Sequence, residues 1–200
     1  MSGRRAESKR RNTDALLAAA RRLFLADGYQ AVGIQAIATE ADLTIGAIYS
    51  LFGSKQALLH AVLANLADQV ESEVRVLAAE PEVDAREAVT RYVRAYHRLV
   101  STVDGWRALR LEVEALSLVL GSAEPERALG EFGAGSRRAL AGLLTGRVLD
   151  GRRLGEPRAE RAAVAVSAVV RGLAVQCAVE PGVASGQRWV ELALAVLAAS

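Results

Sequence analysis

The chain has 200 residues, of which 52% are hydrophobic and 24% charged, and its formal net charge is +2. This length and composition describe a soluble globular protein with one or two domains and a substantial core. The single cysteine, Cys177, excludes an internal disulfide framework and a CxxC metal pair, which fits a reducing cytosol. No apolar segment follows the basic N-terminus and no run of about 18 uncharged apolar residues occurs, so we expect a cytoplasmic protein without a signal peptide or a membrane-spanning helix.

The first eleven residues form a basic segment with a net charge of +4, and the rest of the chain sums to −2. We expect a flexible arm that binds DNA phosphates, because phosphate binding depends on the local potential more than on the total charge. The alternative is a solvated tail that only aids solubility. The basic residues of this segment are Arg4, Arg5, Lys9, Arg10 and Arg11.

The apolar residues that follow the basic segment recur at spacings of three and four, which predicts a helix from about Asn12 to Asp27. Gly28 is expected to end this helix, because glycine readily adopts the left-handed conformation found after helix C-termini. The helix would be the first of a DNA-binding domain.

Residues 34–55, reading IQAIATEADLTIGAIYSLFGSK, predict two short helices that meet at a tight turn. Asp42 suits the left-handed backbone conformation of such a turn, and the hydroxyl of Thr44 can cap the second helix. We therefore expect a three-helix, helix-turn-helix DNA-binding domain over residues 1–53.

The remaining residues, 54–200, predict a helical bundle, so the expected fold is all-α with about nine helices. Three glycines weaken the helix over residues 124–149, where we expect a break or kink, and a polar loop follows at 151–157. The helices expected after the DNA-binding domain span residues 54–79, 84–103, 106–120, 124–149, 158–179 and 185–199.

The last two helices are rich in small apolar residues on more than one face. A helix that is apolar on opposite sides must bury both, and a chain of this size offers no second partner other than another copy of itself. We expect a homodimer formed by these two helices. A central core helix within one chain is the alternative.

Several separated landmarks resemble the TetR family of transcriptional regulators. They are LFLADGY at the end of the first helix, IAxxA in the second, IYSLF at the end of the third and SKxxLL at the start of the fourth. The resemblance covers roughly the first third of the chain. It implies a dimeric DNA-binding protein whose C-terminal domain senses a small molecule.

Candidate DNA-binding residues lie on the predicted recognition helix and beside it. Gln35 suits a bidentate contact with adenine, Ile45 and Ala47 can touch thymine methyl groups, and Gly46 lets the backbone approach closely. The resemblance implies that Tyr49 contacts a phosphate or a base and that Thr44 and Lys55 hold phosphates. With Ser50, these residues complete the expected interface to a palindromic double-stranded operator.

The effector and its binding site are less defined by the sequence. The resemblance implies a small-molecule effector bound among helices five to eight, and the effector is expected to release the DNA. Repression is favoured, because a protein bound over a promoter blocks polymerase without further contacts. The expected lining residues are Tyr92, Tyr96, His97, Trp106, Arg110, Glu114 and Gln176.

The sequence bears on two other function classes, a helical adaptor and an enzyme. A helical adaptor that binds a protein and keeps a degenerate DNA motif is compatible with the few polar groups on the third helix. An enzyme is disfavoured by the lack of a glycine-rich phosphate loop, a nucleophile elbow or histidines at metal-ligand spacing. No metal or other cofactor is expected.

Overall fold

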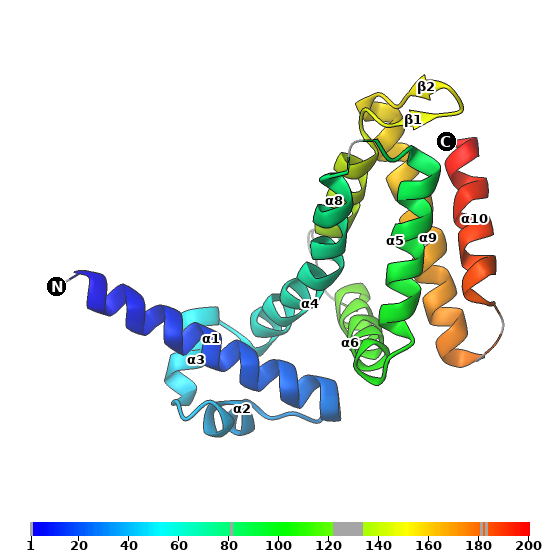
Figure 1. Cartoon of the computed structure of the whole chain (residues 1–200). Helices are drawn as coiled ribbons and strands as arrows, with labels where there is room; N and C mark the ends of the chain where they lie inside the picture. The colour runs from blue at the N-terminus through cyan, green and yellow to red at the C-terminus, as the bar shows by residue number, and fades with distance from the viewer. Residues whose placement is uncertain (1, 81, 122–133, 181, 183) are drawn as a thin grey trace. The chain divides into compact units, whose positions relative to one another are not determined.

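The structure is a computed structural model that describes residues 2–80, 82–121, 134–180, 182 and 184–200 (Figure 1). Within these residues the chain forms nine α-helices and one short β-hairpin, so the predicted all-α class is confirmed.

The chain divides into two compact units. Unit 1 comprises Met1–Leu66 and Arg110–Ala123, and unit 2 comprises Ala67–Leu109 and Glu124–Ser200. Because α4 (Lys55–Ala78) and α6 (Val103–Leu120) cross these boundaries, each contributes residues to both units.

Unit 1 is built on α1 (Ser2–Asp27), α2 (Ile34–Glu40) and α3 (Ile45–Phe52). The three helices pack on one another. Burial of apolar side chains from α1, α2, α3 and the start of α4 drives this packing. The fully buried side chains include Leu16, Ala20, Phe24, Ile37, Ala38, Ile48, Leu58, Leu59 and Val62.

The first helix differs from its prediction at one end. It begins at Ser2 and not near Asn12, so the basic segment is helical and the expectation of a flexible arm was wrong. Arginine, lysine, glutamate and alanine are all strong helix formers, which accounts for the extension. The predicted stop is confirmed, because the helix ends at Asp27 and Gly28 has a φ of 87°.

The turn between α2 and α3 has the predicted geometry. Asp42 adopts a left-handed conformation with a φ of 52°. The backbone N–H of Leu43 donates to the carbonyl of Ala38 at 2.9 Å, and the hydroxyl of Thr44 accepts from the N–H of Ala47 at 3.2 Å. This cap satisfies a donor left free at the start of the recognition helix and fixes where α3 begins.

Unit 2 is a helical bundle around α9 (Glu156–Val179). α9 packs against α8 (Ala134–Leu144) and α10 (Gly186–Ala199), and α10 also packs against α5 (Ala85–Val100). α9 is long and apolar enough to cross a membrane, but a helix in the core of a soluble protein can have the same length and composition. Its buried residues, such as Ala162, Val166 and Val170, lie in the bundle core.

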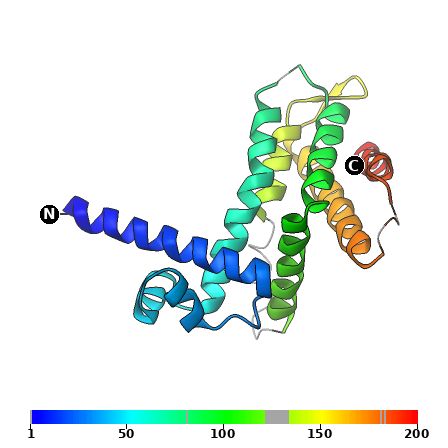
Figure 2. The same ribbon diagram turned by 60° about the horizontal axis from the view of Figure 1, so that its bottom comes forward.

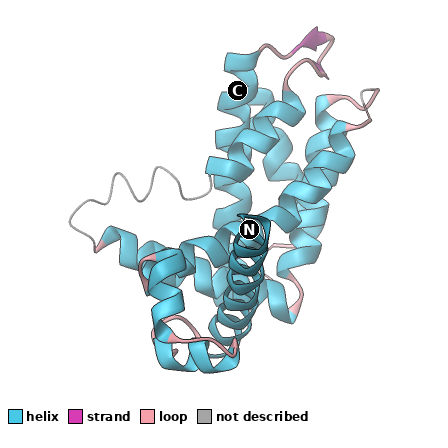
Figure 3. Cartoon of the chain, turned by 90° about the vertical axis from the view of Figure 1, so that its left-hand side faces the viewer, coloured by secondary structure: helices cyan, strands magenta, loops and turns pink. Residues whose placement is uncertain are grey.

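A β-hairpin follows α8 and replaces the end of the helix predicted over residues 124–149 (Figure 3). β1 (Val148–Leu149) pairs antiparallel with β2 (Arg152–Arg153). Asp150 and Gly151 between them both have positive φ, 49° and 78°, as the tight turn of a two-residue hairpin requires. The Asp-Gly pair was the sequence signal for this hairpin. Residues 124–133 of the predicted helix lie outside the described residues.

Candidate nucleic-acid interface

The recognition helix α3 presents its predicted DNA-reading residues outward. Thr44, Gly46, Tyr49 and Ser50 are exposed, and Tyr49 as a whole residue is 53% exposed. Ile45 and Ala47 are half-buried, whereas Ile48 is completely buried and anchors the helix to unit 1. A tyrosine this exposed contributes little to the core, which leaves its ring and hydroxyl available to a partner.

Gly46 has no packing reason to lack a side chain. A Cβ atom built at this position would meet only the hydroxyl oxygen of Thr44, at an ordinary 3.7 Å. Since glycine is costly within a helix, its presence here fits a site where another molecule approaches the backbone.

Gln35 lies exposed on the first turn of α2. Its side-chain amide donates to the hydroxyl of Thr39 at 3.4 Å. This exposed contact is long for a hydrogen bond, so little free energy is lost when the amide turns to another partner.

Lys55 opens α4 and is held beside the loop between α1 and α2. Its ammonium donates to the backbone carbonyl of Tyr29 at 2.7 Å and lies 4.1 Å from the centroid of the Tyr29 ring. Partial burial lowers the pKa of Lys55 and raises that of Tyr29. Because an ammonium has three N–H donors, this anchoring leaves Lys55 able to bind a phosphate as well.

Two residues of α6 that were expected to line an effector site hold this loop and the end of α1 before it. Glu114 accepts the backbone N–H of Tyr29 at 2.7 Å, and Arg110 donates to the carbonyl of Leu25 at 3.3 Å. Arg110 and Glu114 also form an ion pair at 3.7 Å. These contacts, 85 residues apart in the chain, give both residues partners in unit 1 that sequence reasoning did not find.

The basic residues in the first eleven positions are all exposed, namely Arg4, Arg5, Lys9, Arg10 and Arg11. In Figures 1 and 2 the first turns of α1 extend past α2 and α3. The interface candidates of unit 1 therefore comprise this basic helical segment, α3 and the first residues of α2 and α4.

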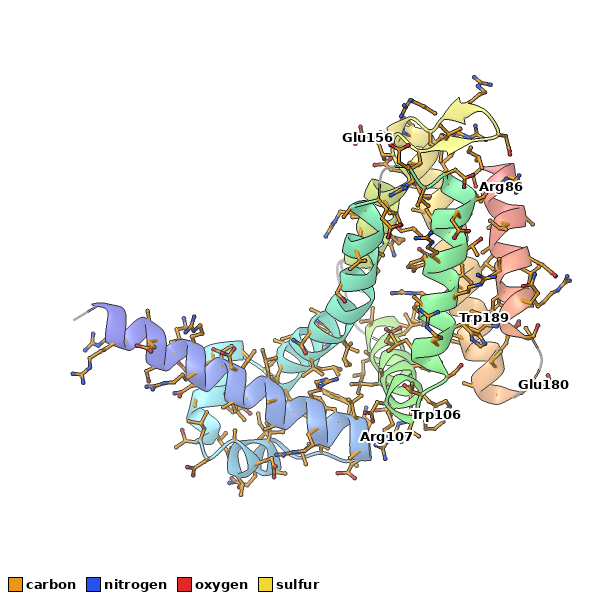
Figure 4. The ribbon with its side chains drawn as sticks, viewed as in Figure 1. Arg86, Trp106, Arg107, Glu156, Glu180 and Trp189 are labelled. Carbon is orange, nitrogen blue, oxygen red and sulfur yellow. The ribbon has the colours of Figure 1, made fainter. Side chains whose placement is uncertain are left out.

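In unit 2 the structure brings together three of the predicted effector-binding residues, Tyr92, Tyr96 and His97. The rings of Tyr96 and His97 contact Trp189 of α10, the helix that packs against α5 (Figure 4), and the ring of Tyr92 contacts that of Tyr96. Trp189 lies 6.5 Å from Tyr96 between ring centroids and meets the ring of His97 edge-on at 5.0 Å. Its indole Nε1 is buried, and none of the described residues accepts a hydrogen bond from it.

Trp189 is the functional candidate that sequence reasoning missed. It lies on the face of α10 that also buries Val190, Ala193 and Leu197, so helical periodicity could have placed it in the core. The other two candidates in unit 2 lie at the surface: Trp106 is 45% exposed and Gln176 is exposed. Among the described residues, no group of three or more histidine, cysteine or acidic side chains could hold a metal ion.

Comparison with known proteins agrees with this architecture. Residues 16–62 match the family model of the bacterial regulatory proteins of the tetR family. The HTH-type transcriptional repressor NicS of Pseudomonas putida is 35% identical over 91 residues, which are 44% of this chain and 43% of that protein. The chain thus matches less than half the length of this relative.

Solved structures extend the similarity to the whole fold. The multidrug binding protein EbrR, complexed with imidazole, has a TM-score of 0.64 at 19% identity, over 92% of this chain and 88% of EbrR. The transcriptional regulator FadR from Bacillus subtilis, in complex with stearoyl-CoA, has a TM-score of 0.60 at 18% identity, over 92% and 95%. The family match and the helix-turn-helix geometry assign the N-terminal domain of the chain to the tetR family of bacterial regulatory proteins, and the solved structures show that the whole chain has the fold of such regulators.

Proposed function

We propose that the protein is a cytoplasmic transcriptional regulator that binds a palindromic DNA operator as a homodimer, represses transcription and releases the DNA when a small molecule binds. The observation that carries this proposal is the capped turn from Asp42 to Thr44, which presents α3 with its exposed face outward. Such a helix enters the major groove with its first turns while the preceding helix crosses the backbone. Family membership also sets the protein apart from enzymes.

Recognition by α3 is proposed to be sparse in hydrogen bonds. Ile45 and Ala47 have methyl groups, Gly46 leaves the backbone accessible, and only a few hydroxyl groups are exposed beside them. Specificity then rests on thymine contacts, close approach and DNA shape, while phosphate contacts by Thr44, Tyr49, Ser50 and Lys55 supply affinity.

The first expected result concerns Gln35, the strongest hydrogen-bonding reader. Gln35→Ala should cost about 1 to 3 kcal/mol of operator binding and relax the preference at one base pair. Binding to operator variants changed at single positions, measured by fluorescence anisotropy, locates that base pair. An equal loss on the operator and on random DNA would show that Gln35 reads no base.

The second expected result concerns Gly46. Gly46→Ala should raise the free energy of unfolding by up to about 1 kcal/mol, because alanine favours a helix and the new methyl group makes only an ordinary contact with the hydroxyl oxygen of Thr44. The same methyl group should weaken operator binding if the DNA approaches the backbone there. Thermal unfolding and anisotropy titrations separate the two effects, and unchanged operator affinity would place the DNA elsewhere.

The proposed dimer is supported by an apolar stripe on α9 that the bundle does not cover. Val164, Val175 and Val179 are 56%, 41% and 82% exposed, and Ala168 and Gly172 between them are also exposed. These residues recur at spacings of three and four, so they share one face of the helix. A two-fold dimer would place two recognition helices about one DNA turn apart, 34 to 36 Å, on a palindrome.

The proposed effector site is the aromatic cluster of unit 2. The rings of Tyr92, Tyr96, His97 and Trp189 would favour an apolar or aromatic ligand, and the indole N–H of Trp189, which no described residue accepts, would donate to an acceptor on it. The EbrR and FadR structures are complexes with imidazole and with stearoyl-CoA, so proteins of this fold bind molecules of very different size.

A gel-shift assay with DNA from upstream of the protein's own gene tests the proposal as a whole. Sequence-specific retardation is expected. Failure to bind any duplex at low salt would favour the helical adaptor, whose partner would be a protein. Sequencing of genomic fragments bound by the protein would then supply the operator and the neighbouring genes.

A further inference from the structure

Lys55 differs in kind from most of the basic residues of this chain. Only Lys9 and Lys55 are lysines, and all the others are arginines. An ammonium is compact and has three N–H donors, whereas a guanidinium is planar and presents its donors in a fixed fork. The Lys55 ammonium lies 2.7 Å from the carbonyl oxygen of Tyr29 and 4.1 Å from the centroid of its ring. This place between a carbonyl and a ring suits a compact cation.

Tyr29, which provides both contacts, is itself fixed in unit 1. Its backbone N–H donates to the carboxylate of Glu114 at 2.7 Å. Its ring packs against the ring of Phe24, with 5.4 Å between the centroids, and Phe24 is fully buried. The Lys55 ammonium is thus attached to a residue that is anchored in the core of unit 1.

These contacts leave part of the ammonium available to another molecule. The hydrogen bond to the Tyr29 carbonyl uses one N–H group, and the ring attracts the charge as a whole without requiring a particular N–H. Lys55 is half-buried, so its ammonium keeps access to solvent. At least one N–H group can therefore donate to a phosphate oxygen while both contacts with Tyr29 persist.

We propose that Tyr29 is a positioning residue for DNA binding, which orders the Lys55 side chain in the free protein so that its ammonium is ready to bind a phosphate. This inference rests on the proposed DNA binding and assigns a role to a residue that acts through Lys55. Immobilising a long side chain on binding lowers the affinity by about 2- to 12-fold. Because Tyr29 already orders Lys55, DNA binding avoids most of this loss.

The position of the ammonium can be measured without DNA. Lysine-selective ¹³C labelling gives two ε-methylene signals, one from Lys55 and one from the exposed Lys9 of α1. The ring current of Tyr29 should shift the Lys55 protons upfield of those of Lys9. The shift should disappear in Tyr29→Leu and remain in Tyr29→Phe, which keeps the ring. Two coincident signals in the wild type would overturn the proposal whether or not the protein binds DNA.

A double-mutant cycle then tests whether Tyr29 acts through Lys55. On a random-sequence duplex of about 30 base pairs, Tyr29→Leu should lower the affinity by about 2- to 12-fold without changing the slope of log affinity against log salt, because no charge is lost. Tyr29→Phe should recover most of that affinity. Lys55→Met should lower the slope by about 0.9. In the Lys55→Met background Tyr29→Leu should have no further effect, whereas in the Lys9→Met background it should keep its full effect.

Circular dichroism and thermal unfolding show whether each variant folds. Equal losses from Tyr29→Leu in the two lysine backgrounds would show that Tyr29 only stabilises unit 1. A higher affinity after Tyr29→Leu would show that Tyr29 withholds the Lys55 ammonium from DNA. Either result would overturn the positioning role while DNA binding by the wild type still stands. A wild type that binds no duplex would instead overturn the proposed function.

Discussion

Val175→Glu is expected to convert the protein from a dimer to a monomer and to lower its affinity for a palindromic operator by about two to four orders of magnitude. Val175 lies on the exposed apolar stripe of α9, and a carboxylate there would be buried without a partner in the proposed dimer. The loss of affinity follows because two linked recognition helices bind their half-sites as one ligand. Sedimentation velocity gives the oligomeric state and anisotropy gives the affinity.

The hairpin offers a matched control for this substitution. Val148 of β1 is 40% exposed, against 41% for Val175, and lies in the same unit on a different surface. Val148→Glu should leave both the dimer and operator binding unchanged. A dimer that survives Val175→Glu with full operator affinity would show that the stripe on α9 is not the interface.

The elements that sequence reasoning located correctly are those whose boundaries depend on neighbouring residues. The turn of the helix-turn-helix requires a residue tolerant of positive φ and a capping hydroxyl, and Asp42 and Thr44 supply both within three positions. Ser54 caps α4 in the same way, accepting from the N–H of Ala57 at 3.0 Å. Local chemistry of this kind can be read without knowing the fold.

Two errors arose where one local signal was preferred to another. The apolar spacing predicts a start of α1 near Asn12, although the charged residues before it favour a helix equally well. The helix predicted through Leu149 overlooked the Asp-Gly turn at Asp150, whose paired positive φ angles form the hairpin.

The contacts that the site residues make depend on tertiary structure, so the sequence pattern did not predict them. Trp189 contacts His97 of another helix that is remote in the chain. Helical periodicity predicts that Trp189 is buried, but it does not predict which residue Trp189 contacts. Likewise, nothing near Glu114 in the sequence indicates that its carboxylate binds the backbone of Tyr29. Such contacts appear only when the helices are packed.

Glu114→Ala is expected to destabilise unit 1 by about 1 to 3 kcal/mol, because it leaves the N–H of Tyr29 without its charged acceptor. The Glu114 side chain is 28% exposed, so water replaces part of the lost interaction and the effect should fall in the lower half of that range. In a chain of this size, 1 kcal/mol corresponds to a shift in Tm of about 2 to 4 °C. Thermal unfolding measures the shift, and hydrogen exchange of the Tyr29 amide locates it.

Operator binding should weaken in the same variant, since the loop at Tyr29 connects α1 to α2 and is held by Lys55 on its other side. Glu114→Gln keeps an acceptor oxygen and should restore most of the stability. Asp104→Ala is the control on the same helix: Asp104 is exposed and pairs only at the surface with Arg107, at 3.4 Å, so its loss should cost less than about 0.5 kcal/mol. If Glu114→Ala and Asp104→Ala were equally mild, the carboxylate of Glu114 would not hold the loop, and the position of the helix-turn-helix would rest on apolar packing alone.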